Sequence, residues 1–195
     1  MRVFVAGGTG AIGRRLVPQL VARGHQVTAT TTSAGKLDLL AQLGADGVVM
    51  DGLDAVSVGE AVAQARPDAI VHQMTALTFA HAGKPNFRHP ERFGALTIRL
   101  RTEGTDHLLA AAEATGVSHV VAQSLAMWPA NRERGLVTEE EPLPLQELPA
   151  KMRIMAEPLH HIEDVVVKAG GAALRYGGFY GPGGGIEDQI ELVRK

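Results

Sequence analysis

The sequence predicts an α/β fold, in which a doubly wound parallel sheet carries helices on both of its faces. Short apolar runs alternate with helical patterns through the first 125 residues, and such strand–helix repeats form parallel sheets with right-handed crossovers. A glycine-rich turn leads directly from the first apolar run into the first helical pattern. The hydrophobic content of 45% over 195 residues is enough for a sizeable core, so one domain over residues 1–195 is expected.

The first strand–helix unit has the clearest boundaries. The apolar run Arg2–Ala6 leads into an amphipathic helix over Ala11–Arg23, and Gly24 marks the C-terminal end of that helix. Pro18 lies inside the helix, where its ring removes one backbone hydrogen bond, so a kink is expected there.

The later elements are delimited by glycine and proline. Ser33 is a suitable N-cap for the second helix, and Gly116 ends a long fourth helix. Residues 126–150 are rich in proline and glutamate, which predicts a long loop. The expected strands are Gln26–Thr30, Gly47–Met50, Ala69–His72, His119–Gln123 and Ala172–Tyr176. The expected helices are Lys36–Leu43, Leu53–Ala65, Glu91–Thr115, Met152–Lys168 and Ile186–Arg194.

The turn after the first strand carries the strongest functional signal. Gly7, Gly10 and Gly13 follow the spacing G-x-x-G-x-x-G. Gly7 can adopt the backbone angles of a tight turn, Gly10 places no side chain between the backbone and a pyrophosphate, and Gly13 lets the helix pack closely on the strand. The helix N-terminus offers free N–H groups and the positive end of its dipole to phosphates. The sequence therefore predicts a dinucleotide site, with an ordinary strand–turn–helix as the alternative.

The overall composition narrows the possible partners. The net charge of −2 gives no general attraction to nucleic acid or to anionic membranes, and no apolar run is long enough to span a membrane. Cysteine is absent and the eight histidines show no metal-site spacing, so no metal site is expected. The N-terminus has no signal-peptide pattern. These features are typical of a cytoplasmic enzyme with a small-molecule substrate and without a nucleic-acid or membrane partner.

Five segments follow one another in an order that is far more specific than the glycine turn alone. They are the turn Gly7–Gly13, Asp51 after the third strand, Ile70–Ala76, Val120–Ser124 and Leu174–Gly183. Together they resemble the extended short-chain dehydrogenase/reductase superfamily, in its NAD-dependent epimerase/dehydratase branch. This resemblance implies a Rossmann-type sheet with the strand order 3-2-1-4-5-6 and a bound NAD or NADP. It also implies an oxidoreductase or epimerase/dehydratase that acts on a small carbonyl, hydroxyl or sugar-type substrate.

The resemblance also assigns roles to individual residues. Asp51 corresponds to an aspartate near the adenine, and the end of the fourth strand lines the cofactor. Ser124 corresponds to a hydroxyl that faces the substrate and orients it, although a strand-end serine bonded to the local backbone is an equally good interpretation. The expected cofactor-binding residues, from the resemblance and from the turn, are Gly7, Thr9, Gly10, Ala11, Ile12, Gly13, Thr31, Ser33, Lys36, Asp51, Gln73, Met74 and Thr75.

The end of the second strand favours NADP over NAD. NAD-preferring enzymes usually carry Asp or Glu there, which accepts hydrogen bonds from the ribose 2′-hydroxyl. The corresponding residues, 30–36, contain no carboxylate. The hydroxyls of Thr31 and Ser33 and the ammonium group of Lys36 can instead bind a 2′-phosphate. The alternative interpretation is a polar turn with a solvated lysine.

The catalytic residues of the family are missing. Its members carry a tyrosine, and a lysine four residues later, on the helix after the fifth strand; the tyrosine exchanges a proton and the lysine lowers the pKa of the tyrosine. The tyrosines of this chain, Tyr176 and Tyr180, lie elsewhere. If Glu163 is matched to the acidic residue of the family's helix, the pair falls on Met155 and Leu159. The general acid is therefore unidentified.

Chain length is a second departure from the family. Its members continue beyond the sixth strand into a substrate lobe, whereas this chain ends at Lys195, so a truncated or missing lobe is expected. A non-catalytic NAD(P)-binding redox sensor or regulator, and an inactive fragment, therefore stay open beside the enzyme. The family dimerises as a four-helix bundle through the helices that correspond to residues 91–115 and 152–168, which predicts a homodimer.

Overall fold

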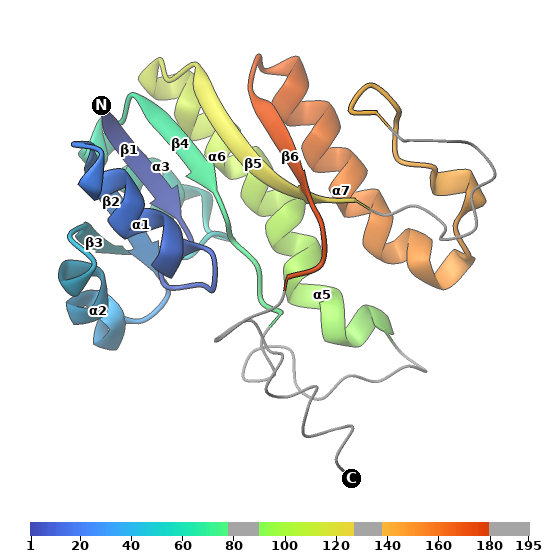
Figure 1. The fold of residues 1–195 in the computed structure, drawn as a ribbon, viewed down its shortest axis with the longest axis horizontal. Helices are drawn as coiled ribbons and strands as arrows, with labels where there is room; N and C mark the ends of the chain where they lie inside the picture. Colours follow the sequence, from blue (N-terminus) through green and yellow to red (C-terminus); the bar gives the residue numbers. More distant parts are fainter. Residues whose placement is uncertain (78–89, 127–137, 180–195) are drawn as a thin grey trace, which may run out of the picture.

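The computed structural model describes residues 1–77, 90–126 and 138–179. In this part of the chain, one parallel sheet has the strand order β3-β2-β1-β4-β5-β6 (Figure 1). The predicted fold class and strand order are therefore confirmed. The strands are β1 (Arg2–Ala6), β2 (Gln26–Thr31), β3 (Asp46–Val49), β4 (Ala69–His72), β5 (His119–Leu125) and β6 (Ala172–Tyr176).

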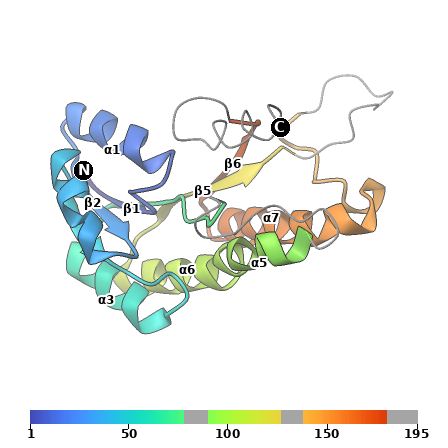
Figure 2. The same cartoon turned by 90° about the horizontal axis from the view of Figure 1, so that it is seen from below.

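Helices cover both faces of the sheet (Figure 2). On one face α1 packs near β2, and on the other α3, α6 and α7 pack against β1, β4, β5 and β6. α5 leads into α6 and also contacts α7, while α2 packs on the edge strand β3. The helices are α1 (Gly13–Ala22), α2 (Leu37–Gln42), α3 (Ala55–Ala65), α5 (Pro90–Arg101), α6 (Glu103–Thr115) and α7 (Ala150–Lys168).

The core consists of one cluster on each face of the sheet, because successive strand residues point to opposite faces. Val3 and Val5 of β1 pack with Val17 of α1 on the first face. Phe4 of β1 packs with the cluster of α3, α6 and α7 on the second face, which includes Ile162. The apolar character of both faces of β1 explains its nearly continuous hydrophobic sequence.

The long helix expected over Glu91–Thr115 is in fact two helices that meet at Thr102. The hydroxyl of Thr102 donates a hydrogen bond to the carbonyl oxygen of Ile98 at 3.1 Å, and the hydroxyl of Thr105 donates to that of Arg101 at 2.7 Å. Such bonds from threonine to carbonyls four residues earlier bend helices. Apolar periodicity does not reveal them, so the prediction of one continuous helix was wrong.

Smaller differences concern element ends. Ser33 does not cap a helix with its side chain; its backbone N–H donates to the Thr31 Oγ1 at 3.3 Å, and a 3₁₀ turn at Ala34–Lys36 precedes α2. α1 begins at Gly13 instead of Ala11 and continues through Pro18, where the expected kink stays a prediction. The expected helix Ile186–Arg194 and part of the expected loop 126–150 lie outside the described residues.

Candidate cofactor and substrate site

Gly7 and Gly13 are required by the close approach of backbone segments. Ala6 pairs with His72, so Gly7 and Gln73 lie side by side where β1 and β4 end. Gly7 has a φ of +97°, and a Cβ there would lie 2.8 Å from the Gln73 carbonyl oxygen. A Cβ on Gly13 would lie 2.4 Å from the Gly7 carbonyl oxygen. Neither position accepts a side chain without moving backbone.

Gly10 differs from these two glycines because the protein itself leaves room for a side chain there. Gly10 is exposed, and the nearest atom to an added Cβ is the Gly7 carbonyl oxygen at 3.3 Å. A glycine that packing does not require fits a surface that a ligand approaches closely. This observation agrees with the predicted role of Gly10 toward a pyrophosphate.

The N-terminus of α1 has free hydrogen-bond donors. Its N-cap residue, Ile12, has no side-chain capping group. Within the described residues, the backbone N–H groups of Ala11 and Ile12 have no hydrogen-bond acceptor. Arg14 Nε donates to the Thr9 carbonyl oxygen at 2.8 Å and so stabilises the turn. Free N–H groups at the positive end of a helix dipole are the usual donors to phosphate oxygens.

Two threonine hydroxyls at the end of β2 form hydrogen bonds with the glycine turn. The backbone N–H of Gly7 donates to Thr30 Oγ1 at 3.0 Å, and Thr9 Oγ1 lies 3.4 Å from Thr31 Oγ1. Thr31 is buried and its hydroxyl contacts the glycine turn, so the expected contact of this hydroxyl with the cofactor stays a prediction. Ser33 is exposed and Lys36 is half-buried, which leaves these two side chains accessible beyond β2.

Asp51 lies at the end of the neighbouring strand β3, where its exposed side chain closes a turn. Its Oδ1 accepts a hydrogen bond from the Leu53 N–H at 2.9 Å, and its own N–H donates to Ser57 Oγ at 3.1 Å. The remaining carboxylate oxygen is accessible, so the contact expected near the adenine stays a prediction.

The segment after β4 contains an orphaned buried acceptor. Gln73 is 6% exposed, and its Oε1 has no hydrogen-bond partner within the described residues. Its Nε2 donates to the Tyr176 hydroxyl at 3.4 Å. A buried amide oxygen without a donor is costly, so a donor from a bound molecule fits here. Met74 points its side chain into the core, which leaves its backbone and the half-buried Thr75 for the expected cofactor contacts.

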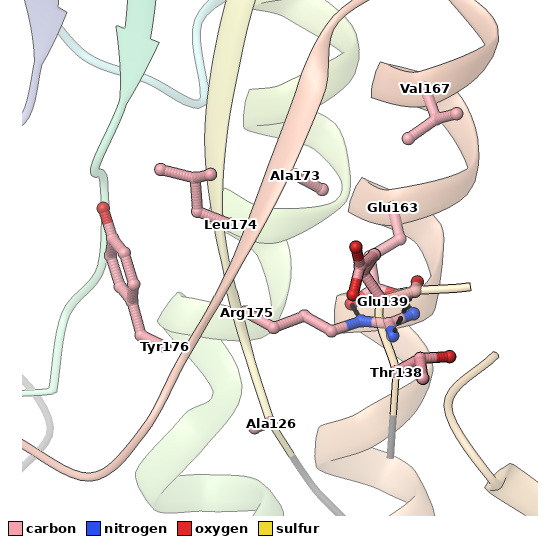
Figure 3. A pocket seen from close by; sticks show the side chains of 9 residues that line it. All are labelled: Ala126, Thr138, Glu139, Glu163, Val167, Ala173, Leu174, Arg175 and Tyr176. Atoms are coloured by element: carbon pink, nitrogen blue, oxygen red, sulfur yellow. Dashed lines mark hydrogen bonds and ion pairs between the residues drawn. The ribbon is translucent and has the colours of Figure 1, made fainter. Parts of the chain in front are cut away.

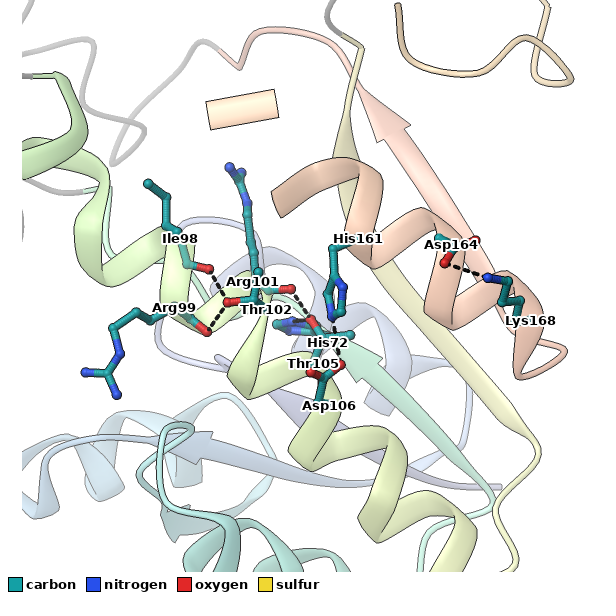
Figure 4. A network of polar contacts seen from close by, with 10 residues as sticks. All are labelled: His72, Ile98, Arg99, Arg101, Thr102, Thr105, Asp106, His161, Asp164 and Lys168. Atoms are coloured by element: carbon teal, nitrogen blue, oxygen red, sulfur yellow. Dashed lines mark hydrogen bonds and ion pairs between the residues drawn. The ribbon is translucent and has the colours of Figure 1, made fainter. Parts of the chain in front are cut away.

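His72, which precedes this segment, is held as a neutral imidazole (Figure 4). The Met74 N–H donates to His72 Nδ1 at 3.2 Å, and Nε2 lies 3.0 Å from Thr105 Oγ1, whose own hydrogen is donated to the Arg101 carbonyl. Nδ1 is therefore an acceptor, and Nε2 must carry the proton. Burial lowers the pKa of His72 to about 4, and the charge of Arg101 also lowers it. This chain of bonds joins the β4 exit to α6.

Acidification is expected to destabilise the protein through His72. The unfolded chain takes up this proton near pH 6.5, whereas the folded protein takes it up only near pH 4. The stabilisation is therefore complete above pH 6.5 and is lost as the pH falls toward 4. The shift corresponds to about 3 kcal/mol of unfolding free energy, which urea unfolding measured between pH 7 and 4.5 will detect.

Two variants show whether His72 is the responsible group. Gln cannot titrate but keeps a donor and an acceptor, so His72→Gln is expected to flatten this pH dependence. His119→Gln removes an exposed histidine at the start of β5 and is the matched control. An unchanged slope in His72→Gln would assign the effect to other groups.

Ser124 and Arg175 both bind the carboxylate of Glu163, and Figure 3 shows Arg175 beside Glu163. The Ser124 hydroxyl donates to Glu163 Oε1 at 2.7 Å. Arg175 binds the same carboxylate with Nε at 2.9 Å and with Nη2 at 2.7 Å, and these hydrogen bonds raise the pKa of Arg175. Ser124 is 0% exposed. Its hydroxyl is thus satisfied by a distant carboxylate, and neither an open substrate space nor the local backbone provides its partner.

Arg175 also attaches the segment after residue 137 to the sheet. Its Nη1 donates to the carbonyl oxygens of Glu141 at 2.6 Å and Glu139 at 3.2 Å. Beside this contact lies a hollow of about 680 Å³ whose lining includes Glu139, Glu163 and Tyr176 (Figure 3). The hollow lies beside the edge strand β6. Placement of the cofactor at the glycine turn, at the carboxyl ends of β1 and β4, stays a prediction.

The α7 residues matched to the missing pair are apolar contacts between helices. Leu159 is fully buried, and Met155 lies against Gly94 of α5. His161, also on α7, lies with Nε2 2.7 Å from Asp106 Oδ1 of α6. No three His, Asp or Glu side chains in the described ranges are placed to hold a metal ion. Nor does any described helix combine the length and hydropathy needed to cross a membrane.

Sequence comparison agrees with a dinucleotide site. A family model described as NAD(P)H-binding matches residues 7–156. A 3-diazoavenalumate denitrifying reductase from a Streptomyces species is 42% identical over 191 residues, which make up 95% of this chain and 58% of that protein. The chain thus spans less than two thirds of the length of this relative.

Solved structures with the same fold include epimerases of nucleotide sugars. The UDP-glucose 4-epimerase of Thermus thermophilus, in complex with NAD, is 26% identical with a TM-score of 0.67; the match covers 93% of this chain and 57% of that one. A UDP-galactose 4-epimerase is 24% identical with a TM-score of 0.75, over 100% of this chain and 63% of that one. The second likeness shows the fold alone.

Proposed function

Because this chain belongs to the NAD(P)H-binding family, we propose that it forms the nucleotide-binding part of an NAD(P)H-dependent reductase. The observation that carries this proposal is the glycine turn with its free N–H groups at Ala11 and Ile12. The 42% identity to a reductase supports the reaction class. When bound, the reduced nicotinamide supplies a hydride.

Different groups of the protein would bind different parts of the cofactor. The N–H groups of Ala11 and Ile12 would receive the pyrophosphate, and Gly10 would leave it room. Gln73 Oε1, which lacks a donor within the described residues, would accept a hydrogen bond from the cofactor. Asp51 would lie near the adenine. Thr30 and Thr31 would act indirectly, since their hydroxyls hold the turn in shape.

NADPH is the proposed cofactor in preference to NADH. Ser33 and Lys36 are accessible beyond β2 and can bind a 2′-phosphate, and residues 30–36 include no carboxylate to repel it. We expect NADPH to bind more tightly than NADH when nicotinamide fluorescence is titrated. Lys36→Met is expected to weaken NADPH binding about tenfold and to leave NADH binding unchanged. Lys151→Met, an exposed lysine of α7, is the control. The absence of saturable binding of either nucleotide would refute the function itself.

Ser124 is the proposed substrate-orienting residue. Its hydrogen is held by Glu163, so the hydroxyl oxygen is disposed to accept a hydrogen bond from a substrate hydroxyl. Because the side chain is fully buried, substrate reaches this oxygen only after neighbouring groups move aside. Candidate substrates are small carbonyl, hydroxyl or sugar-type molecules, and 3-diazoavenalumate by analogy with the relative. Ser124→Ala is expected to slow NADPH oxidation without changing NADPH affinity; full activity would remove Ser124 from the mechanism.

The second candidate function is nucleotide binding without turnover. An inactive fragment of an enzyme would also bind the nucleotide without turnover. Met155 and Leu159, which match the family's catalytic pair, provide no proton donor. Saturable NADPH binding without oxidation across a panel of carbonyl substrates would favour this candidate.

A homodimer through α5, α6 and α7 is proposed as the assembly. Exposed apolar side chains occur on two of these helices, at Leu96, Met152, Ile154 and Val167. Burying such side chains against a second copy would be favourable. Sedimentation velocity across a hundredfold concentration range tests this; a monomer throughout would contradict it.

A further inference from the structure

Arg101, the last residue of α5, is a buried cation that has no counterion among the described residues. The residue is 5% exposed, and its Nε is enclosed without an acceptor. Across residues 1–77, 90–126 and 138–179, no hydrogen bond or ion pair reaches its guanidinium group (Figure 4). Burial lowers the pKa of Arg101 to about 10, so the group keeps its charge at neutral pH. Buried charges in proteins are normally paired, because leaving them unpaired is strongly unfavourable.

The position of Arg101 is at the carboxyl edge of the sheet, next to the segment that follows β4. Its carbonyl accepts the Thr105 hydrogen in the His72 chain of bonds, and its charge lowers the pKa of His72. One helical face carries Gly94, Thr97 and Arg101, all buried, and Thr97 Oγ1 accepts the Ala76 N–H at 3.0 Å. Arg101 is therefore beside the proposed nucleotide site and on a face that is turned inward.

The contacts on both sides of Arg101 place it opposite a defined part of α7. Gly94, before it, meets Met155, and Asp106, after it, binds His161. Arg101 thus lies along the stretch of α7 between residues 155 and 161. This stretch contains Met155 and Leu159, the positions that match the family's missing tyrosine and lysine. α5 therefore carries a cation, Arg101, opposite the stretch of α7 where Leu159 stands in place of the family's lysine.

We propose that Arg101 binds the carboxylate of an organic-acid substrate. This carboxylate would be the counterion of the buried guanidinium group. The proposal rests on the proposed function and names the substrate class for that site. A guanidinium group donates two parallel hydrogen bonds to a carboxylate and keeps its protons at neutral pH, so it does not serve as a general acid. The pyrophosphate of the nucleotide has its own donors at the N-terminus of α1, on a different helix. Among the described residues no carboxylate reaches Arg101, and a substrate carboxylate would supply the missing anion.

Arg101 is proposed to bind a ligand and not to stabilise the fold, and these two roles predict opposite changes in stability. In Arg101→Met a neutral side chain of similar length replaces the unpaired buried charge. The variant is expected to unfold at a higher urea concentration than the natural protein. A lower midpoint would indicate a structural partner for Arg101 and would overturn the proposal.

The binding test uses cinnamate and cinnamamide, which differ in charge and hardly in shape. Both are titrated by calorimetry against the full chain, with and without saturating NADPH. We expect cinnamate to bind about tenfold more tightly than the amide, Arg101→Met to remove the preference, and Arg101→Lys to restore part of it. Arg99→Met, which removes an exposed arginine paired with Glu103 on the same helix, is expected to keep the preference.

Each outcome of this experiment is informative. Equal binding of acid and amide to the natural protein, or a preference that persists in Arg101→Met, would overturn the carboxylate site. NADPH affinity is measured in the same samples, and its absence would instead contradict the proposed function. If the natural protein prefers the acid, Arg101→Met loses this preference and NADPH binds, both the carboxylate site and the proposed function are supported.

Discussion

Replacing Gly13 by alanine is expected to abolish NADPH binding and to destabilise the fold, whereas Gly10→Ala is expected to weaken binding and leave the fold intact. A Cβ on Gly13 would lie 2.4 Å from the Gly7 carbonyl oxygen and 2.5 Å from that of Gly8, so backbone must move. Overpacking of this kind costs about 3 kcal/mol. A Cβ on Gly10 meets the Gly7 carbonyl oxygen at 3.3 Å and would extend toward the ligand.

Urea unfolding and NADPH titration, carried out on both variants, separate stability from binding. Gly59→Ala is the control, because Gly59 lies within α3 and an added Cβ there meets nothing within 4 Å. That change is expected to stabilise the protein by about 0.5–1 kcal/mol, since glycine is a poor helix former. If Gly10→Ala bound NADPH as well as the natural protein, the pyrophosphate would not lie at this turn.

Apolar runs in the sequence were enough to predict those strands whose ends are marked by glycine or polar residues. The strands Arg2–Ala6, Ala69–His72 and Ala172–Tyr176 have the predicted boundaries. The first two are largely buried in the parallel sheet, whereas β6 is an exposed edge strand. The chain leaves each of the three runs through glycine or a polar residue. The glycine turn was predictable for the same reason, because its spacing reflects backbone contacts that only glycine allows.

Interactions between distant residues could not be predicted from these local signals. Ser124 was matched to a substrate contact, but its partner is Glu163, which comes 39 residues later. Thr31 was expected to face a phosphate, yet its hydroxyl is turned toward Thr9 and the glycine turn. The lack of a partner for Arg101 among the described residues depends on how α5 packs against the rest of the fold, and the sequence of α5 alone does not reveal it. Side-chain direction at the end of a strand is decided by such tertiary contacts.

Arg175→Met is expected to produce the largest loss of stability among single substitutions in the Glu163 cluster. The side chains of Arg175 and Glu163 are 19% and 13% exposed, and two hydrogen bonds of 2.7 and 2.9 Å join them. The variant would leave the Glu163 carboxylate with Ser124 as its remaining partner in this cluster. Removing one partner of a largely buried ion pair costs about 3–5 kcal/mol, which urea unfolding at pH 7 measures.

The double variant Glu163→Leu/Arg175→Met distinguishes a lost attraction from a stranded charge. If the cost arises because an uncompensated carboxylate stays buried, removing that carboxylate as well should restore most of the stability. Lys168→Met, which breaks an exposed pair with Asp164 on the same helix, should have little measurable effect. A double variant as unstable as Arg175→Met would show that Arg175 acts instead by holding Glu139 and Glu141 to the sheet. In that case the main role of Arg175 would be to bind the segment that contains Glu139 and Glu141 and borders the 680 Å³ hollow.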